Sequence, residues 1–116
     1  MKEIEHGARI QRKLLQQLER ANALLLAHAD VNLVRQALHW VVVGGGPSGV
    51  ELTAELCDLV NTDVARHFPL LRPHLRITLL EGGGLLPQFP RDIAAYAQRT
   101  LGDLGAEVRC NTLVTR

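Results

Sequence analysis

The 116-residue chain has few aromatic side chains and no excess of charge of either sign. One Trp, one Tyr and two Phe leave little flat surface on which nucleic-acid bases could stack. The 13 Lys and Arg residues nearly balance the 12 Asp and Glu residues, and no segment gathers the positive charge into a basic patch. We therefore expect no nucleic-acid partner.

Cysteine pairs and metal-binding patterns are also missing. Cys57 and Cys110 are distant in sequence and form no Cys-x-x-Cys motif, so neither a disulfide framework nor a dithiol redox centre is predicted. We expect both thiols to fill small apolar spaces. The histidines follow no metal-binding spacing, so we expect no metal site; they are His6, His28, His39, His67 and His74.

Long apolar runs are absent as well, because no stretch approaches the roughly 18–20 apolar residues of a membrane-spanning helix. Glu3 and Glu5 come early, and no short apolar core follows residues 1–12, so neither a secretory signal nor an acid-poor targeting peptide is predicted. Hydrophobic residues still make up 47% of the chain, which is typical of a folded domain. We expect a soluble chain with a real core.

The first 37 residues carry a helical pattern. Residues 2–28 contain no proline, and their apolar side chains recur every three or four positions, which predicts one long amphipathic helix. Asp30 and Asn32 indicate a break with a cap or a turn, and residues 33–37 add a short helical turn. We assign residues 1–37 to a helical lead-in.

Strand and helix patterns then alternate through residues 38–116. The β-branched run at 38–43 predicts a buried strand. The further predicted elements are a helix from Pro47 to about Arg66, a strand at 75–80, a helix at 90–104 closed by Gly105, a strand at 106–110 and another short strand around 113–115. Strands separated by helices run parallel with right-handed crossovers. The predicted fold class is α/β: half of a doubly wound Rossmann-type parallel sheet (βαβαβ), preceded by the long amphipathic helix.

A glycine-rich loop separates the first predicted strand from the helix after it. The loop matches Gly-x-Gly-x-x-Gly and consists of Gly44, Gly45, Gly46, Pro47, Ser48 and Gly49. In such a loop the first glycine permits a tight turn, the second lets phosphates approach the backbone, and the third lets the helix pack close to the strand. Free N–H groups and the positive end of the helix dipole meet the charge of a pyrophosphate. The loop therefore predicts a dinucleotide site.

Two other known loop motifs that resemble this pattern do not match the sequence. A Walker loop requires Lys and then Ser or Thr after the last glycine, but Val50 and Glu51 stand there. A hydrolase elbow requires glycine two residues after Ser48, where Val50 stands. We therefore predict no nucleophile at Ser48, and no catalytic side chain is assigned in the chain.

Two carboxylates are candidate cofactor contacts. Glu81 ends the second predicted strand, where an acid accepts hydrogen bonds from adenosine ribose hydroxyls and favours NADH over NADPH. It follows Gly49 by 32 positions instead of about 20, and the extra length falls in the long helix and in residues 68–74. Glu51 is predicted in the first helical turn after the loop, where it either interacts with the helix dipole or accepts the nicotinamide carboxamide N–H.

The segment from Trp40 to Leu52, together with residues 54–58, resembles the NADH-binding domain of type II NADH dehydrogenases, within the pyridine nucleotide-disulfide oxidoreductase-like flavoproteins. The resemblance continues through residues 76–81 and 85–89 and includes the helix before the sheet. A long helix after the glycine loop is a feature of that family, which accounts for the wide spacing to Glu81. The resemblance implies that the glycine loop, Glu51 and Glu81 contact NADH.

The same resemblance implies a larger enzyme. Members of that family use one dinucleotide fold for FAD and one for NADH, plus a C-terminal membrane-binding region. We expect residues 38–116 to be an incomplete NADH-binding domain without the FAD domain and that C-terminal region. The implied reaction passes a hydride from NADH to FAD and electrons then to a quinone, peripherally at the mitochondrial inner membrane. We expect the isolated chain to be inactive without its FAD half, and a homodimer is left open.

Two other assignments stay open. One is the NAD(P)-binding portion of another flavoprotein reductase with two dinucleotide folds, because the Cys-x-x-Cys motif of such enzymes normally lies in the FAD half. The other is a non-catalytic module that binds a nucleotide, or another chain through an exposed sheet edge. Selective NADH binding favours the dehydrogenase, whereas self-association without nucleotide binding favours the interaction module.

Overall fold

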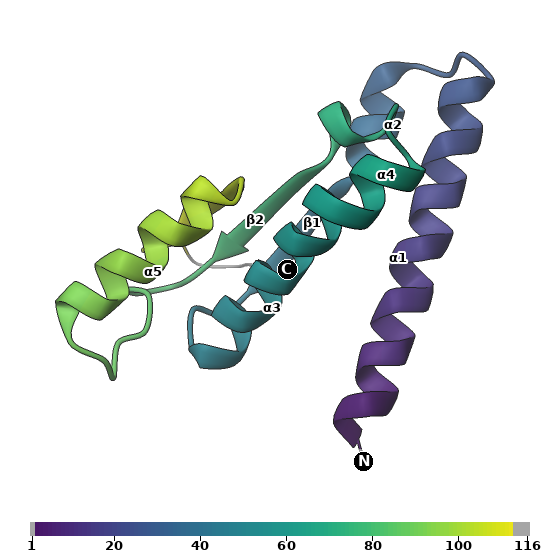
Figure 1. Ribbon diagram of the computed structural model, residues 1–116. Coiled ribbons are helices and arrows are strands. Elements are labelled where there is room, and N and C mark those ends of the chain that lie inside the picture. The colour runs from purple at the N-terminus through teal and green to yellow at the C-terminus, as the bar shows by residue number, and fades with distance from the viewer. Residues whose placement is uncertain (1, 113–116) are drawn as a thin grey trace.

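A computed structural model describes residues 2–112, with side chains from residue 9 onward. A three-stranded parallel sheet carries two helices on one face (Figure 1). The long N-terminal helix lies beside the first of these two helices, on the side away from the second. The strands are β1 (His39–Val43), β2 (Arg76–Leu80) and β3 (Ala106–Arg109), and they are hydrogen-bonded in the order β1-β2-β3. This order confirms the predicted α/β class and the half-Rossmann arrangement. The further strand predicted around 113–115 lies outside the described residues.

Helix α1 (Lys2–Leu26) confirms the predicted long helix, and α2 (Val31–Ala37) follows it after a short turn. Asp30 is the N-cap of α2, because its side chain accepts a hydrogen bond from the Asn32 N–H at 2.9 Å. This cap allows α2 to begin two residues before the predicted turn at 33–37. Leu18 and Ala21 of α1 and Val34 of α2 are buried together in the core.

The crossover between β1 and β2 is built from consecutive helical elements. Helix α3 (Pro47–Leu59) begins with proline at its first position and continues into a π-helical segment, η1 (Val60–Val64). A single turn, α4 (Ala65–His67), and a 3₁₀ turn, η2 (Arg72–His74), then lead to β2. The predicted helix to about Arg66 is thus correct in extent, although residues 60–64 within it are wound as π helix and not as α helix.

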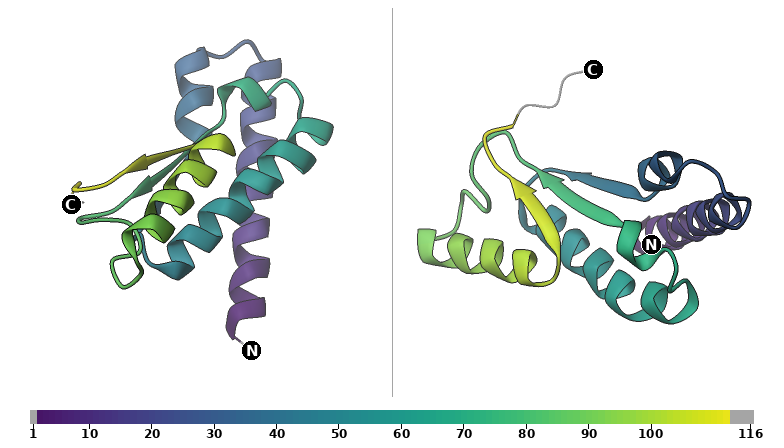
Figure 2. Two further views of the ribbon diagram at one scale, coloured as in Figure 1. Left: turned by 60° about the vertical axis from the view of Figure 1, so that its left-hand side comes forward. Right: turned by 90° about the horizontal axis from the view of Figure 1, so that it is seen from above.

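Helix α5 (Arg91–Asp103) connects β2 to β3 and buries Leu101. Gly105 has a φ of +106°, a left-handed conformation that lets the chain turn from the helix into β3 and confirms the predicted cap. Helices α3 and α5 lie on the same face of the sheet, as the view from above shows (Figure 2). Leu79 of β2 is fully buried beneath them.

The opposite face of the sheet is open. Burial alternates along β1, so Trp40 and Val42 are buried, whereas Val41 is 48% exposed and Val43 is 63% exposed. The prediction of a strand buried throughout is therefore wrong for one of its two faces. Helices α3 and α5 both cover the other face, and no element of the described part of the chain covers this one.

The two cysteines differ in burial. Cys57 lies in the core, where desolvation raises the pKa of its thiol despite the opposing charge of Arg72. Cys110 is half-buried and packs against the core, and both thiols are free. Within residues 2–112, no helix is long and apolar enough to cross a membrane, and the described His, Cys, Asp and Glu residues form no group that could hold a metal ion.

Candidate dinucleotide-binding site

The glycine loop leaves β1 through a tight turn. Gly44 has a φ of +112°, a conformation that other residues rarely adopt. Its N–H donates to the carbonyl oxygen of Leu80 at 2.8 Å, so the turn is tied to the end of β2. The loop therefore begins at the carboxyl edge of the sheet, where parallel α/β folds bind their ligands.

Gly49 allows the helix to pack directly against this turn. A Cβ atom at Gly49 would overlap the carbonyl oxygen of Gly44, and Leu79 closes the same space at 3.8 Å. The Thr53 hydroxyl, fully buried, donates to the Gly49 carbonyl oxygen at 2.8 Å. The close approach of helix and strand expected at the third glycine is therefore present.

Gly46 lies on the open side of the loop. A Cβ atom there would have no neighbour within 4 Å, so the space beside this backbone is empty of protein. Gly46 is also the N-cap of α3, with extended backbone angles and no side-chain cap. The first N–H groups of a helix lack partners within the helix, and the helix dipole adds positive character there. Bare backbone at a helix start is suited to an anion such as pyrophosphate.

Glu81 follows β2 and folds back onto the glycine loop. Its Oε1 accepts the Gly45 N–H at 2.7 Å, and its Oε2 accepts the Gly83 N–H at 2.9 Å. These hydrogen bonds, the one from Gly83 first, together with a contribution from the Gly82 N–H, lower the pKa of the Glu81 carboxyl. The side chain is therefore a carboxylate at neutral pH and lies beside the candidate pyrophosphate site.

The segment after Glu81 is anchored by two residues that sequence reasoning did not assign to the site. Leu85 and Leu86 are buried, and the Leu86 N–H donates to the Gly45 carbonyl oxygen at 2.8 Å. The Glu81 N–H donates to the Arg109 carbonyl oxygen at 2.9 Å, which fixes the start of the segment. The sequence did contain a signal for this anchoring: two adjacent leucines stand in a loop of glycine and proline, and apolar side chains in such a loop indicate burial.

Among the described residues, the other predicted contacts form no hydrogen bond with the Glu81 carboxylate. Pro47, Ser48 and Glu51 are exposed on the first two turns of α3. Glu51 is the fifth residue of the helix, and the first turn contains no acid, so its predicted place in that turn is wrong. Because the dipole effect falls off after the first turn, a capping role for Glu51 is weakened.

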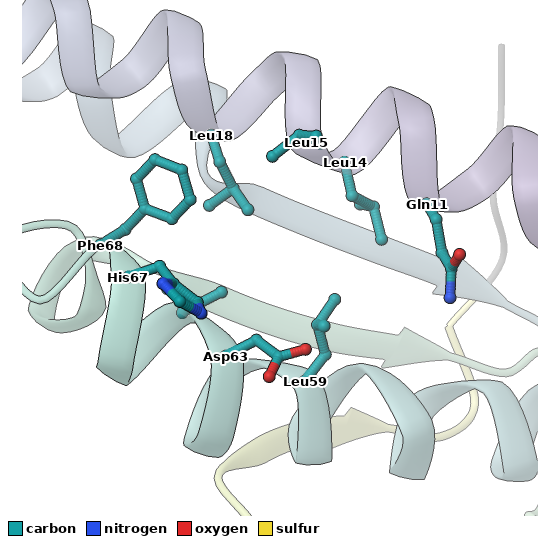
Figure 3. A pocket seen from close by; sticks show the side chains of 9 residues that line it. Gln11, Leu14, Leu15, Leu18, Leu59, Asp63, His67 and Phe68 are labelled. Atoms are coloured by element: carbon teal, nitrogen blue, oxygen red, sulfur yellow. The ribbon is translucent and has the colours of Figure 1, made fainter.

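A hollow of the described chain lies away from the glycine loop. A groove of about 560 Å³ separates α1 from the end of α3 and the turns after it. Figure 3 shows Leu14 and Leu18 of α1 facing Asp63, His67 and Phe68 across this groove. It shares no residue with the glycine loop, whereas a neighbouring hollow of about 510 Å³ between α1 and α3 includes Ser48 of that loop.

A positive-φ turn, bare backbone at a helix start and a carboxylate after the second parallel strand together define a dinucleotide-binding unit of the Rossmann type. The family described as "Pyridine nucleotide-disulphide oxidoreductase" matches residues 3–116. The chain belongs to this family.

Individual similar proteins point to one group within this family. The chain is 35% identical to the external alternative NAD(P)H-ubiquinone oxidoreductase B2, mitochondrial, of Arabidopsis thaliana, with all of this chain and 20% of that protein aligned. It is 34% identical to the external alternative NADH-ubiquinone oxidoreductase, mitochondrial, of Yarrowia lipolytica, over 98% of this chain and 19% of that protein. The chain thus spans about one fifth of the length of these relatives.

A solved structure shares the fold. NDH2 from Plasmodium falciparum in complex with NADH superposes with a TM-score of 0.88 and 33% identity, covering 96% of this chain and 22% of that one. The resemblance to type II NADH dehydrogenases inferred from the sequence is therefore confirmed. The matched region is a dinucleotide-binding part of a pyridine nucleotide oxidoreductase.

Proposed function

We propose that this chain binds NADH and holds it for hydride transfer to FAD in a flavin-dependent NADH:quinone oxidoreductase of type II. The observation that carries the proposal is the open backbone at Gly46, with the Glu81 carboxylate fixed beside the same loop. A solved relative with the same fold is described as a complex with NADH, which supports a nicotinamide dinucleotide as the ligand.

In this proposal each part of the site has one task. The N–H groups at the start of α3 donate hydrogen bonds to the pyrophosphate oxygens, and the bare backbone of Gly46 leaves room for them. The Glu81 carboxylate accepts hydrogen bonds from ribose hydroxyls, and its charge opposes the extra phosphate of NADPH. When bound, the nicotinamide ring supplies the hydride that the flavin receives, so no side chain here acts as a catalytic acid or base.

The proposal also includes the domain bounds, a role for Glu51, the location in the cell and the oligomeric state. Residues 1–37 are the helical lead-in and residues 38–116 the NADH-binding portion, while FAD and quinone contacts belong to other parts of the enzyme. Glu51 is proposed as a nicotinamide-side contact. The two curated relatives described above are mitochondrial by name, which supports a mitochondrial location. The peripheral position at the inner membrane is part of the proposal. A homodimer is compatible with the proposal.

Titration of the purified 116-residue chain with NADH and NADPH tests the proposal. We expect saturable binding with a lower Kd for NADH. Gly46→Val fills the open backbone with a branched side chain and should abolish binding, while the helix content measured by circular dichroism is retained. Gly102→Val on α5 is the matched control, because a Cβ there also has no neighbour within 4 Å.

Three outcomes contradict the proposal or parts of it. Unchanged affinity in Gly46→Val contradicts the role of the loop. Tighter binding of NADPH than of NADH favours a different reductase of the family. Self-association with no binding of either nucleotide favours the interaction module.

A further inference from the structure

Gly45 occupies the position that the glycine pattern leaves free, yet of the loop glycines only Gly49 is more crowded. A Cβ atom there would lie 2.9 Å from Cγ of Glu81, 3.1 Å from Cβ of Glu81 and 3.0 Å from Cδ1 of Leu85. Real Cβ atoms essentially never approach other atoms below 3.0 Å, so any side chain at Gly45 displaces a neighbour. The neighbouring Gly46 has no such contact.

Both backbone groups of Gly45 join the loop to the segment after β2. Its N–H donates to Oε1 of Glu81 at 2.7 Å, and its carbonyl accepts the Leu86 N–H at 2.8 Å. The N–H of Gly45 is therefore already used and is not a free donor for a phosphate. Its role is to hold the carboxylate, which is a different role from that of Gly46.

The carboxylate is left able to bind a ligand. Each oxygen of Glu81 accepts one backbone N–H, from Gly45 or from Gly83. A carboxylate has about four acceptor positions, so each oxygen retains one for a further donor. Two fixed oxygens with one free position each are suited to the two hydroxyls of a ribose.

We propose that Gly45 determines the nucleotide specificity of this site by positioning the Glu81 carboxylate. The inference rests on the proposed function and extends it to a residue that the sequence pattern leaves unspecified. A Cβ at Gly45 pushes the Glu81 side chain off the loop and breaks the Gly45 hydrogen bond. The freed carboxylate then accepts ribose hydroxyls less well and opposes the NADPH phosphate from a greater distance.

The first test compares the Kd values for NADH and NADPH in the unaltered chain, Gly45→Ala, Glu81→Gln and the double variant. We expect Gly45→Ala to reduce the preference for NADH about tenfold, the size of one lost hydrogen bond to a charged group. Because both changes act through one carboxylate, the double variant should lose no more preference than Glu81→Gln alone. Gly102→Ala is the matched control and should keep the preference, since its Cβ enters open space.

The second test needs no nucleotide. The carboxyl carbon of Glu81 is followed by NMR during an acid titration of the unaltered chain and of Gly45→Ala. We expect the titration midpoint to move upward in Gly45→Ala, because one hydrogen bond to the charged form is lost. If Gly45→Ala does not fold, the amide proton of Gly45 in the unaltered chain is followed instead, and its shift should change with the Glu81 titration.

The outcomes separate this inference from the proposed function. If the unaltered chain binds neither nucleotide but the Glu81 midpoint moves in Gly45→Ala, the proposed function fails and the positioning role of Gly45 is supported. If NADH is preferred and Gly45→Ala changes neither the preference nor the midpoint, the inference is overturned while the proposed function stands. A Gly45 amide proton that ignores the Glu81 titration also overturns it.

Discussion

At the carboxyl edge of the sheet, the glycine loop is held by short polar contacts to residues far along the chain, namely Leu80, Glu81 and Leu86. Along α1, by contrast, the contacts are apolar and incomplete. Leu18 is only 5% exposed, but Leu15 is 48% exposed, three residues earlier on the same helix. The loop is therefore held by directional hydrogen bonds, whereas α1, in the part whose side chains are described, is held by apolar contacts around Leu18 and Ala21.

Substitutions in these two regions should therefore differ in their effect on stability. At Gly49, backbone approaches backbone, so an added carbon atom has no room and cannot be accommodated by rotating a side chain. Beside α1, a groove already separates the helix from the turns after α3, so side chains there can change with little rearrangement (Figure 3). Three substitutions test this contrast, in decreasing order of expected effect.

The largest effect is expected for Gly49→Val. Its Cβ would overlap the carbonyl oxygen of Gly44, so α3 must move away from the turn that leaves β1. We expect the free energy of unfolding to fall by about 3 kcal/mol, the upper part of the range for overpacking, and nucleotide binding to be lost with it. Urea unfolding followed by circular dichroism measures this change.

Gly102→Val is the control for that experiment, because it makes the same change where a Cβ has no neighbour within 4 Å. Its free energy of unfolding should stay within about 0.5 kcal/mol of the unaltered chain. Equal stability of Gly49→Val and Gly102→Val would show that the loop and the helix are not packed as described.

An intermediate effect is expected for Leu18→Ala on α1. Leu18 is buried against the core, and truncating a buried leucine costs about 2 kcal/mol at the lower end of the measured range. The lower end applies because the residue also lines the groove, where little new cavity is created. Leu15→Ala should change stability by less than about 0.5 kcal/mol, since half of that side chain is already exposed. A larger loss for Leu15→Ala than for Leu18→Ala would contradict the observed packing of α1.

Local patterns in the sequence were sufficient to predict the order of elements and the ends of the loop. The apolar period of α1, the β-branched run of β1 and the glycines at 44, 49 and 105 each act over a few neighbouring residues. The contact between Gly45 and Glu81 was not predictable in this way, because it joins residues 36 positions apart. The exposure of Val41 and Val43 depends on what covers the second face of the sheet, which a strand pattern does not specify.

The smallest effect is expected from the charge of Glu81 itself. Because its pKa is lowered in the folded chain by the hydrogen bonds from Gly83 and Gly45, the carboxylate stabilises the fold above its ordinary pKa of about 4.3. As the pH falls from that value through the lowered pKa of the folded chain, the unfolded chain binds the proton more readily, so this stabilisation is lost. Urea unfolding of Glu81→Gln should therefore depend less on pH in this window than unfolding of the unaltered chain.

Salt separates Glu81 from the other carboxyl with a lowered pKa. Glu107 owes its lowered pKa first to the hydrogen bond from Arg109, at 2.7 Å, and then to Arg76 at 3.0 Å, and both are exposed ion pairs. High salt screens such pairs but acts less on hydrogen bonds from backbone N–H groups. In 0.5 M salt the screening length falls to about a few ångströms. Under these conditions the difference in pH-dependent stability between the unaltered chain and Glu81→Gln should persist, while the difference for Glu107→Gln should shrink. If the Glu81 difference disappears with salt as well, its carboxylate is held by general charge and not by the glycine loop.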